Sequence, residues 1–363
     1  MSSETLERAA RQMRAQDVDA VLVGPGADLR YLTGYHALPL TRLTLLVARA
    51  DGEHVLVVPR LELPRAQAAG IPDSVRLVAT EETEDPYAVV AGALHGLVAG
   101  RLAAGDRLWA LFLLNLQQAV PNASWFPASV VTRELRMRKA PAEVDALRRA
   151  GQAIDRVQAR VPALLRPGRT EVEVGRDIAD AIVAEGHQEV NFVIVGSGPN
   201  GASPHHETSA RILQPGDGVV VDIGGTLDGY CSDCTRDYVV GAAPPGYAEA
   251  HTALEVAQAA ACAAVRPGVT AETVDAAARD VLADAGYGEH FIHRTGHGIG
   301  LEEHEDPYIV AGNREVLEEG MAFSVEPGVY LPGRFGMRIE DIVVVTADGG
   351  ERLNLGERAA VVV

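Results

Sequence analysis

The C-terminal half of this chain contains an internal repeat. The segment RPGRT at residues 166–170 returns as RPGVT at residues 266–270, an offset of 100 residues. The same offset pairs three further positions along the chain: Asp180 with Asp280, Gly186 with Gly286 and Glu189 with Glu289. Halves of this size cannot bury their own apolar faces, so they are expected to pack together about a pseudo-twofold axis. The repeat predicts a duplicated domain built from two helix-plus-strand halves.

The repeat also aligns four acidic residues. The segments VVVDIGG and FSVEPGV match, so Asp222 corresponds to Glu326 at an offset of 104, and Asp233 corresponds to Glu340 at an offset of 107. Offsets that drift in this way are expected where loops differ in length. Each acid alone could simply cap a turn at the end of a strand. A duplication that superposes all of them favours a shared functional site where the halves meet.

These acids lie in short apolar or glycine-rich segments, and His297 lies in a similar setting between Gly296 and Gly298. Carboxylates that converge in a protein interior repel one another and resist ionisation unless cations neutralise them. Oxygen-rich ligation with one imidazole suits two divalent ions bridged by water better than a structural zinc ion, which favours thiolates. The sequence therefore predicts a two-metal hydrolytic site formed by Asp222, Asp233, His297, Glu326 and Glu340.

Further histidines lie in loops that are expected to border this site. His205 and His206 follow a glycine-rich loop, and His304 follows His297 in a second glycine-containing loop. Histidines beside a metal site are candidates for polarising a carbonyl group or stabilising a tetrahedral oxyanion. This places the substrate on the histidine side of the site.

The N-terminal part of the chain, residues 1–130, alternates short apolar runs with helical stretches. Strands are expected at 21–23, 43–49 and 55–58, and the sequence Ala-Asp-Gly-Glu at 50–53 predicts a hairpin turn. Pro141 begins a helix whose apolar residues recur every three or four positions. We place the domain boundary near residue 130, which gives an N-terminal domain at 1–130 and a catalytic domain at 131–363.

Composition excludes several classes of partner. The chain has 32 basic and 50 acidic residues, for a formal net charge of −18. Nucleic acids and anionic membranes both need a basic surface, so neither is expected as a partner. The polar start of the chain lacks a signal-peptide core, and no apolar run approaches the roughly 20 residues of a membrane helix.

The three cysteines indicate a reducing cytoplasm, because so few in 363 residues do not form a disulfide framework. Cys231 and Cys234 have CxxC spacing. On a strand, however, residues three apart face opposite sides, so we expect neither zinc binding nor redox chemistry from this pair.

Five segments of residues 140–363 resemble the pita-bread metallopeptidases, which include methionine aminopeptidase, aminopeptidase P, prolidase and the metal-free creatinase. The segments are SPHHE, VVVDIGGTLDGYCSDCTRD, HRTGHGIGLEEHEDP, FSVEPGVY and MRIED. The segment LRYLTGY at 29–35 resembles the creatinase-type N-terminal domain, which methionine aminopeptidases lack. The resemblance implies an α/β (α+β) chain in which this domain precedes a pita-bread catalytic domain, and it narrows the family to the proline-specific peptidases.

The resemblance also implies roles for individual residues. Asp222 would bind one metal ion, Asp233 and Glu340 would bridge two ions, and His297 and Glu326 would complete the second. Glu326 would also take the proton of the attacking water. The remaining catalytic and substrate-binding residues implied are His205, His304, Arg338 and Tyr330. One departure is Asp237, where the family usually has threonine, so we expect an altered metal preference or altered hydrogen bonding around the site.

The function implied is hydrolysis of Xaa-Pro peptide bonds with two divalent metal ions, Mn²⁺ being preferred over Co²⁺, Zn²⁺ or Fe²⁺. A prolidase-like dipeptidase is favoured over an Xaa-Pro aminopeptidase that acts on longer peptides. A non-catalytic binding protein and a non-peptide amidohydrolase on the same fold remain alternatives. The expected partner is a small peptide with proline after the scissile bond, and the family resemblance implies a homodimer.

Overall fold

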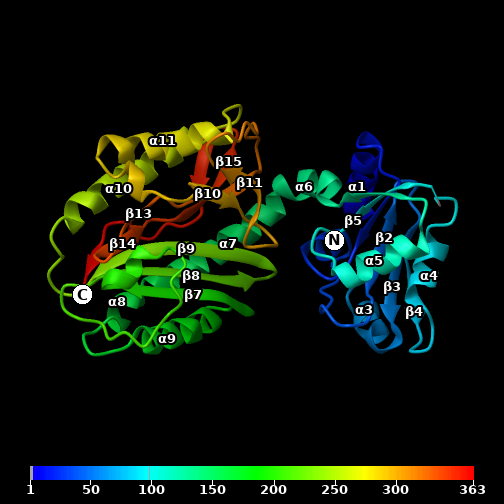
Figure 1. Ribbon diagram of the computed structural model, residues 1–363, viewed down its shortest axis with the longest axis horizontal. Coiled ribbons are helices and arrows are strands. Elements are labelled where there is room, and N and C mark those ends of the chain that lie inside the picture. The colour runs from blue at the N-terminus through cyan, green and yellow to red at the C-terminus, as the bar shows by residue number, and fades with distance from the viewer. Residues whose placement is uncertain (1–2, 98) are drawn as a thin grey trace. The chain divides into compact units, whose positions relative to one another are not determined.

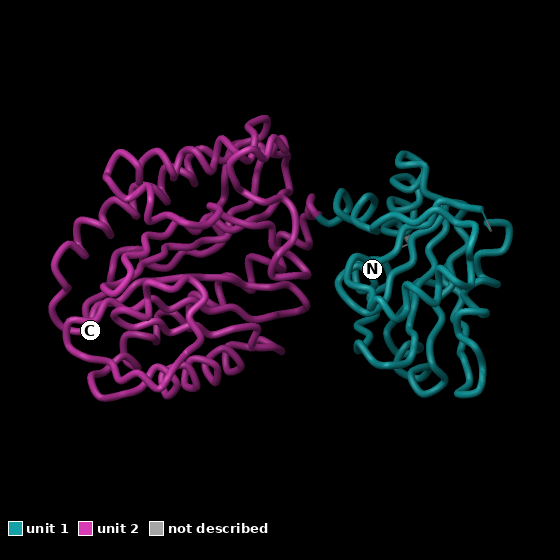
Figure 2. Tube along the Cα trace, in the orientation of Figure 1, with its two compact units in different colours: residues 1–136 teal, residues 137–363 magenta. Residues whose placement is uncertain are grey.

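The computed structural model describes residues 3–97 and 99–363 (Figure 1). The chain divides into two compact units, Met1–Arg136 and Met137–Val363, which Figure 2 shows in different colours. The mixed α/β content predicted from the sequence is confirmed.

The N-terminal unit is built on one mixed sheet with the strand order β4-β3-β2-β1-β5-β6. Its strands are β1 (Ala20–Val23), β2 (Leu45–Arg49), β3 (His54–Pro59), β4 (Val75–Thr80), β5 (Arg101–Ala104) and β6 (Ser124–Pro127). Its helices are α1 (Ser3–Ala15), α2 (Ala27–Thr33), α3 (Leu63–Ala68), α4 (Pro86–Ala93), α5 (Ala110–Ala119) and α6 (Ser129–Met137). The hairpin predicted around 50–53 is confirmed, because β2 and β3 pair antiparallel with Leu46 opposite Leu56.

The C-terminal unit contains three sheets, with strand orders β17-β9-β8-β7, β11-β10-β12-β15-β16 and β13-β14. The strands are β7 (Glu189–Ser197), β8 (Gly218–Leu227), β9 (Tyr230–Val239), β10 (Gly296–Gly298), β11 (Glu305–Ile309), β12 (Ala322–Val325), β13 (Gly328–Leu331), β14 (Phe335–Arg338), β15 (Asp341–Thr346), β16 (Gly349–Arg352) and β17 (Val361–Val362). The helices are α7 (Pro141–Gln158), α8 (Val161–Leu164), α9 (Glu171–Ala184), α10 (Tyr247–Ala264) and α11 (Ala271–Asp284).

The duplication predicted from the RPGxT repeat is visible in the backbone. Thr170 and Thr270 precede α9 and α11, which are both 14 residues long, with the same dihedral angles, φ −86° and ψ 155°. Thr170 forms an isolated bridge with Ile212, and Thr270 forms the equivalent bridge with Val316. The repeat therefore encodes one structural unit twice: a turn, a helix and the strand that follows.

Each half covers one face of its sheet with helices (Figure 1). In the first half, residues of α7 and α9 form a core with Val219, Val221 and Ile223 of β8. In the second half, α10 and α11 form a separate core with strands that include β12 and β15. Side chains alternate along a strand, so Asp222 faces away from the helices that cover its neighbours. Asp222 therefore lies on the face of β8 that these helices do not cover.

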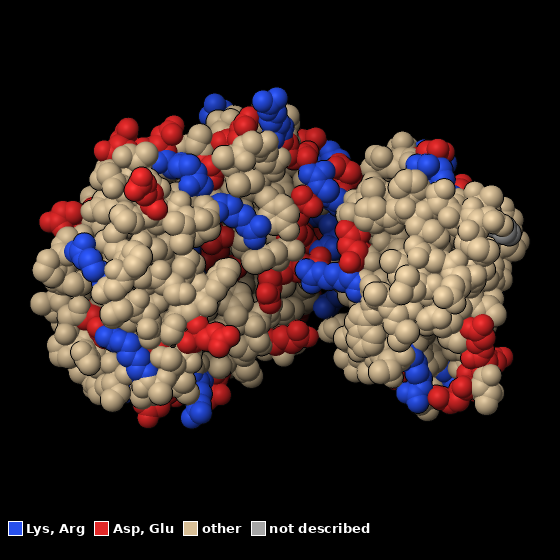
Figure 3. Space-filling view, in the orientation of Figure 1, with Lys and Arg blue, Asp and Glu red and all other residues tan. Residues whose placement is uncertain are grey.

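Charged side chains of both signs lie on the face of the C-terminal unit that Figure 3 draws. On the face drawn in Figure 3, acidic and basic side chains are interspersed over the C-terminal unit with much uncharged surface between them. Among residues 3–97 and 99–363, none of the helices has both the length and the apolar character of a membrane span.

Candidate active site

Two of the predicted metal ligands lie on neighbouring strands of one hairpin. Asp222 of β8 is opposite Thr235 of β9, and Gly224 of β8 is opposite Asp233 of β9. Positions two apart on a strand share a face, so Asp222 and Asp233 are diagonal neighbours on the same side of the hairpin. The β8–β9 register therefore brings together two acids that are separated by eleven positions in sequence.

The second half supplies its donors from strand ends and from the short strand β10. Glu326 follows β12, Glu340 lies between β14 and β15, and His297 is the central residue of β10. Glycines flank His297 for a steric reason. A Cβ atom on Gly296 would lie 1.8 Å from the carbonyl oxygen of Ser324, and one on Gly298 would lie 2.2 Å from that of Asp306. Only glycine permits this approach to the neighbouring chain segments.

The donors from the two halves converge. Ligand atoms of Asp233, His297 and Glu340 all lie within 4.8 Å of one another. The Nε2 atom of His297 is 3.2 Å from Oε1 of Glu326 and 3.7 Å from Oδ2 of Asp233. Its Nδ1 atom lies 3.1 Å from the carbonyl oxygen of Gly298, which can only accept a hydrogen bond, so Nδ1 carries the proton. This tautomer directs the Nε2 lone pair toward the acids, as a metal ligand requires.

Several buried carboxylate oxygens in this group have unmet bonding capacity. Within the described residues, Oδ1 of Asp222, Oδ1 of Asp233 and Oε1 of Glu340 have no hydrogen-bond partner. A buried polar atom without a partner costs roughly 1–3 kcal/mol, and more when it is charged. Carboxylate oxygens with one imidazole are suitable donors for divalent ions such as Mn²⁺. The residues present therefore fit the two metal ions predicted from the sequence.

The pKa values of these residues also indicate a site for cations. Burial, and then the neighbouring acids, raise the pKa values of Asp233 and Glu340 well above their ordinary range. Burial raises the pKa of Glu326 to about 7 although the charge of Arg338 opposes the change. Burial lowers the pKa of His297 to about 3, so its imidazole is neutral. Without cations the acids hold protons, and a bound cation would displace them.

Arg338 organises the acids from the centre of the site. Its Nη2 atom donates to Oδ2 of Asp222 at 2.5 Å, and its Nη1 atom donates to the hydroxyl of Tyr330 at 2.8 Å. Its Nε atom donates to the hydroxyl of Thr235 at 3.1 Å, and that hydroxyl donates to Oε2 of Glu340 at 2.6 Å. One buried guanidinium thus aligns an acid from each half.

Asp237, the departure from the family pattern, lies behind Arg338. Its Oδ1 atom accepts a hydrogen bond from the backbone amide of Arg338 at 3.2 Å. Its Oδ2 atom is 3.4 Å from Nε2 of His251 on α10. Asp237 therefore belongs to the hydrogen bonds that support Arg338.

The predicted substrate-side residues lie around this centre. The ring centroid of His304 is 4.0 Å from that of His297. The Tyr330 hydroxyl is 2.9 Å from Nε2 of His293, a histidine to which the sequence analysis assigned no role. Burial lowers the pKa of His293 to about 4, and the charge of Arg338 contributes to that shift, while the side chain of His205 is exposed. His206 takes a different direction, since its Nε2 atom is 2.8 Å from Oε2 of Glu171.

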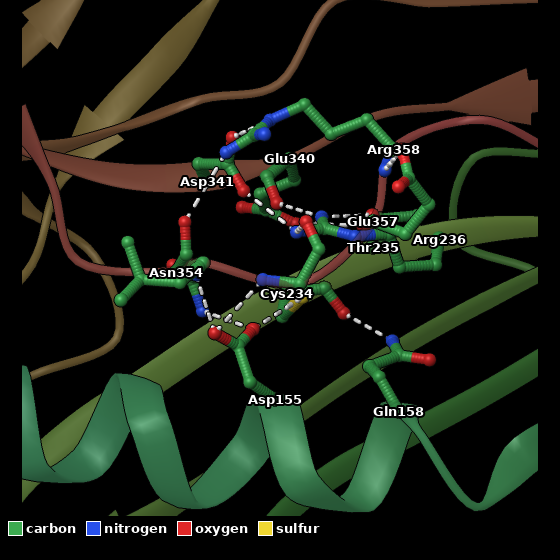
Figure 4. A network of polar contacts seen from close by, with 12 residues as sticks. Asp155, Gln158, Cys234, Thr235, Arg236, Glu340, Asp341, Asn354, Glu357 and Arg358 are labelled. Carbon is green, nitrogen blue, oxygen red and sulfur yellow. Dashed lines mark hydrogen bonds and ion pairs between the residues drawn. The ribbon is translucent and has the colours of Figure 1, made fainter.

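A buried ion-pair network supports the site behind Glu340 (Figure 4). Arg236 donates to the backbone carbonyl of Glu340 at 2.6 Å and to Oδ1 of Asp341 at 2.8 Å. The other oxygen of Asp341 accepts hydrogen bonds from Arg358 at 2.6 Å and from Gln258 at 2.8 Å. The adjacent acids therefore have different surroundings. Glu340 faces the candidate metal site, whereas Asp341 forms ion pairs with Arg236 and Arg358.

Comparison with known proteins assigns both parts of the chain. Residues 145–347 match the model of metallopeptidase family M24, and residues 5–138 match that of the creatinase/prolidase N-terminal domain.

Similar proteins match over nearly the full length. A probable dipeptidase PepE from Mycobacterium tuberculosis is 54% identical over 97% of this chain and 95% of its own. An Xaa-Pro dipeptidase from Lactobacillus delbrueckii is 36% identical over 95% of both chains. The solved structure of a prolidase from Thermococcus sibiricus superposes with a TM-score of 0.94 at 35% identity, over 99% of each chain.

Proposed function

We propose that this chain, which belongs to metallopeptidase family M24, hydrolyses the bond before proline in Xaa-Pro dipeptides with two divalent metal ions. The observation that carries the proposal is the set of buried carboxylate oxygens without partners, on Asp222, Asp233 and Glu340, beside His297. Relatives named probable dipeptidase and Xaa-Pro dipeptidase support this substrate class.

The donor set suggests which residues would hold the ions. Asp222, Asp233 and Glu340 would supply carboxylate oxygens from both halves, and His297 with Glu326 would complete the set. When bound, two such ions supply a water molecule of lowered pKa and positive charge for the carbonyl oxygen. We propose Mn²⁺ as the native metal, because the ligands are mostly carboxylate oxygens, with Co²⁺, Zn²⁺ and Fe²⁺ as alternatives.

Glu326 is the candidate for proton transfer. Burial raises its pKa to about 7 in the metal-free chain, and bound cations would lower it again, so the assignment rests on the position of its Oε1 atom, 3.2 Å from Nε2 of His297. Its Oε1 atom accepts a hydrogen bond from the Ser324 hydroxyl at 3.0 Å, which fixes its orientation. Glu326 takes a proton as the water oxygen bonds to the carbonyl carbon. It returns that proton to the proline nitrogen as the carbon–nitrogen bond breaks, which releases an amino acid and proline.

Histidines and a tyrosine hold the substrate. His304, against the ring of His297, and His205 are proposed to bind the scissile carbonyl and the developing oxyanion. Tyr330 receives a hydrogen bond from Arg338, which positions its hydroxyl beside the acids. Arg338 itself keeps Asp222 and Thr235 in place.

Preference for dipeptides requires a cation for the free carboxylate of proline, and Arg294 is a candidate for that role. Its guanidinium lies 4.5 Å from the ring centroid of Tyr308, and the residue is partly buried. After the larger effect of burial, its positive charge tends to lower the pKa values of His297 and Glu326, which places it near the reacting groups.

Replacing Arg294 with alanine is expected to lower kcat/KM for Ala-Pro by about 10–100-fold, because a hydrogen bond to a charged group contributes roughly 1.5–3 kcal/mol. Hydrolysis of Ala-Pro-Ala, which presents no carboxylate at that position, should not change. Arg314→Ala serves as the control, since that side chain is 87% exposed. Equal losses on both peptides would contradict a carboxylate-binding role, and wild-type cleavage of Ala-Pro-Ala as fast as Ala-Pro would favour the aminopeptidase alternative.

Removal of metal with a chelator is expected to abolish hydrolysis of Ala-Pro, and added Mn²⁺ or Co²⁺ should restore it. Proline release measured before and after readdition tests this directly. Hydrolysis of Ala-Pro that survives complete metal removal would contradict the proposed metal dependence. Tight stoichiometric metal binding without cleavage of any proline peptide would favour a binding protein, and cleavage confined to other amides would favour the amidohydrolase.

Two further proposals concern the cellular compartment and the oligomeric state of the enzyme. The three cysteines, Cys231, Cys234 and Cys262, are free thiols, which supports the proposal of a reducing cytoplasm. The homodimer implied by the family resemblance stays a prediction.

A further inference from the structure

The loop 198–209, which begins with the 3-10 turn Gly198–Ala202 after β7, carries His205 on its exposed side. We propose that Glu171, on the first turn of α9, is a positioning residue that holds this loop and thereby aims His205 at the substrate. The inference rests on the proposed function, in which His205 binds the substrate carbonyl.

Glu171 is a fully buried carboxylate that the proposed mechanism does not otherwise use, with an exposed fraction of 0%. Its Oε1 atom accepts hydrogen bonds from the amide of Ser197 at 2.8 Å, from its hydroxyl at 2.6 Å and from Asn200 at 3.1 Å. Its Oε2 atom accepts from the amide of Ser209 at 3.1 Å and from its hydroxyl at 2.6 Å, and lies 2.8 Å from Nε2 of His206. All these donors lie in the loop or at the residue that precedes it.

The charge of Glu171 is stabilised by these bonds. Burial alone would raise its pKa, but the hydrogen bonds from Ser197, Ser209 and His206 outweigh that effect and lower it. A buried carboxylate with both oxygens saturated by donors is rigid, and removing its charge leaves donors unpaired. Glu171 therefore ties both ends of the loop to one point.

The loop is held on its other side by the strand that carries Arg338. Arg338 Nη1 donates to the carbonyl oxygen of Pro204 at 3.3 Å. The backbones of Gly201 and Gly336 pack so closely that a Cβ atom on Gly336 would lie 1.9 Å from the Gly201 carbonyl oxygen. His205 lies between Pro204, which Arg338 contacts, and His206, which Glu171 contacts. Its backbone is thus fixed from both directions while its side chain stays exposed.

Adjacent histidines consequently have separate tasks. His206 faces inward to Glu171, whereas the side chain of His205 is exposed. A displacement on the order of 1 Å in a substrate-positioning group can cost about 10²-fold in rate. Loss of the Glu171 anchor should therefore weaken substrate binding without affecting the metal ligands.

Glu171→Gln tests the proposal with a side chain of the same shape. An amide has one accepting oxygen, so its NH₂ group must face a set of donors and several bonds are lost. We expect KM for Ala-Pro to rise about tenfold and kcat/KM to fall between about 10-fold and 10²-fold, with unchanged metal content. Amide hydrogen exchange at Ser197 and Ser209, whose amides donate to Glu171, should accelerate.

Glu173→Gln is the matched control. Glu173 lies on the same turn of α9, but it binds Thr170 at the start of the helix and not the loop. Its replacement should leave kcat/KM within about twofold, and glutamine can keep the capping box with Thr170, so the melting temperature should change little. If Glu171→Gln does not fold, His206→Ala removes one donor and should raise KM in the same direction, by a smaller factor.

The two proposals fail in distinguishable ways. Wild-type protein that does not cleave Ala-Pro would reject the proposed function, whereas loop exchange in the variants still reports on the anchor. A Glu171→Gln chain with wild-type KM and wild-type exchange at Ser197 and Ser209 would reject the positioning role. A fall in kcat at constant KM, with wild-type exchange at both amides, would also reject it, because that pattern indicates a smaller active fraction and not a displaced loop.

Discussion

Asp233→Asn is expected to abolish Ala-Pro hydrolysis and, in the metal-free chain, to raise the free energy of unfolding. The loss of turnover should exceed the ~10–100-fold cost of removing a residue that only supports a metal ligand, because Asp233 is a candidate bridge between both ions. The gain in stability follows from charge. Burial and the nearby acids Glu340 and Asp222 raise the pKa of Asp233 well above its usual range, so its ionised form is unfavourable in the folded chain. Asparagine is neutral in both the folded and the unfolded chain, so folding of the variant requires neither that buried charge nor the uptake of a proton.

The measurement combines metal content, proline release and thermal unfolding in the presence of a chelator. Asp228→Asn is a control for the same chemical change on the same hairpin, since its side chain is 58% exposed and it lies in the turn between β8 and β9. A variant that keeps wild-type turnover would rule out the bridging role. A lower melting temperature for metal-free Asp233→Asn would show that the carboxylate stabilises the fold by itself.

The duplicated fold is predictable from the sequence because its repeating unit is local. The turn before α9 needs a glycine with positive φ and a threonine at the start of the helix, and the turn before α11 needs the same. Gly168 and Gly268 supply the first requirement, with φ angles of 92° and 86°. Short-range requirements of this kind leave a recognisable pattern in sequence.

The convergence of the acids is also predictable, since it follows from strand parity and from the alignment of the two halves. Asp222 and Asp233 share a face because β8 and β9 form a tight hairpin. Glu340 joins them because it occupies the position in the second half that Asp233 occupies in the first. The physical reason to expect metal, repulsion among buried carboxylates, needs only residue types and burial.

The anchoring residues could not be predicted, because their partners are remote in sequence. Glu171 and Glu173 are both acids in the first turn of α9. One is buried against Ser197 and Ser209, which are 26 and 38 positions away, and the other caps its own helix. Arg236 likewise meets Asp341 across 105 positions. Local patterns distinguish neither case, because these contacts arise only when segments remote in sequence pack together, within the first half for Glu171 and between the halves for Arg236.

Binding of Mn²⁺ is expected to raise the free energy of unfolding. It should also remove the pH dependence that the buried acids give to this free energy between about pH 7 and about pH 8. In the metal-free chain, burial and neighbouring acids raise the pKa values of Asp233 and Glu340 well above their usual range, and burial raises that of Glu326 to about 7. In an unfolded chain the pKa values of these carboxyl groups are about 4. Their stabilising contribution is complete below that pH and is lost as the pH rises through the folded-state values.

Groups outside the candidate metal site contribute alike with chelator and with Mn²⁺; one of them is His251, because burial alone would lower its pKa but its contacts with Asp237 raise it. The pKa of His297 is lowered by burial to about 3, so its contribution has the opposite sign. It is present above the unfolded value of about 6.5 and is lost only as the pH falls. Unfolded thiols titrate near about pH 8.5, above the window. Between these limits, each proton that the folded metal-free chain retains lowers the free energy of unfolding by about 1.4 kcal/mol per pH unit.

Bound metal replaces those protons, so the part of the slope that these acids cause should vanish, and an ion at about 1,000 times its Kd should add about 4 kcal/mol per site. Urea unfolding at several pH values, with chelator and with Mn²⁺, measures both effects. The Asp233→Asn chain should show a shallower slope with chelator, because it has one titrating carboxylate fewer. A metal-free chain whose stability is constant across this window would mean that the buried acids are already neutralised by the protein, through Arg338 and Thr235, and that a cation is not required to balance their charge.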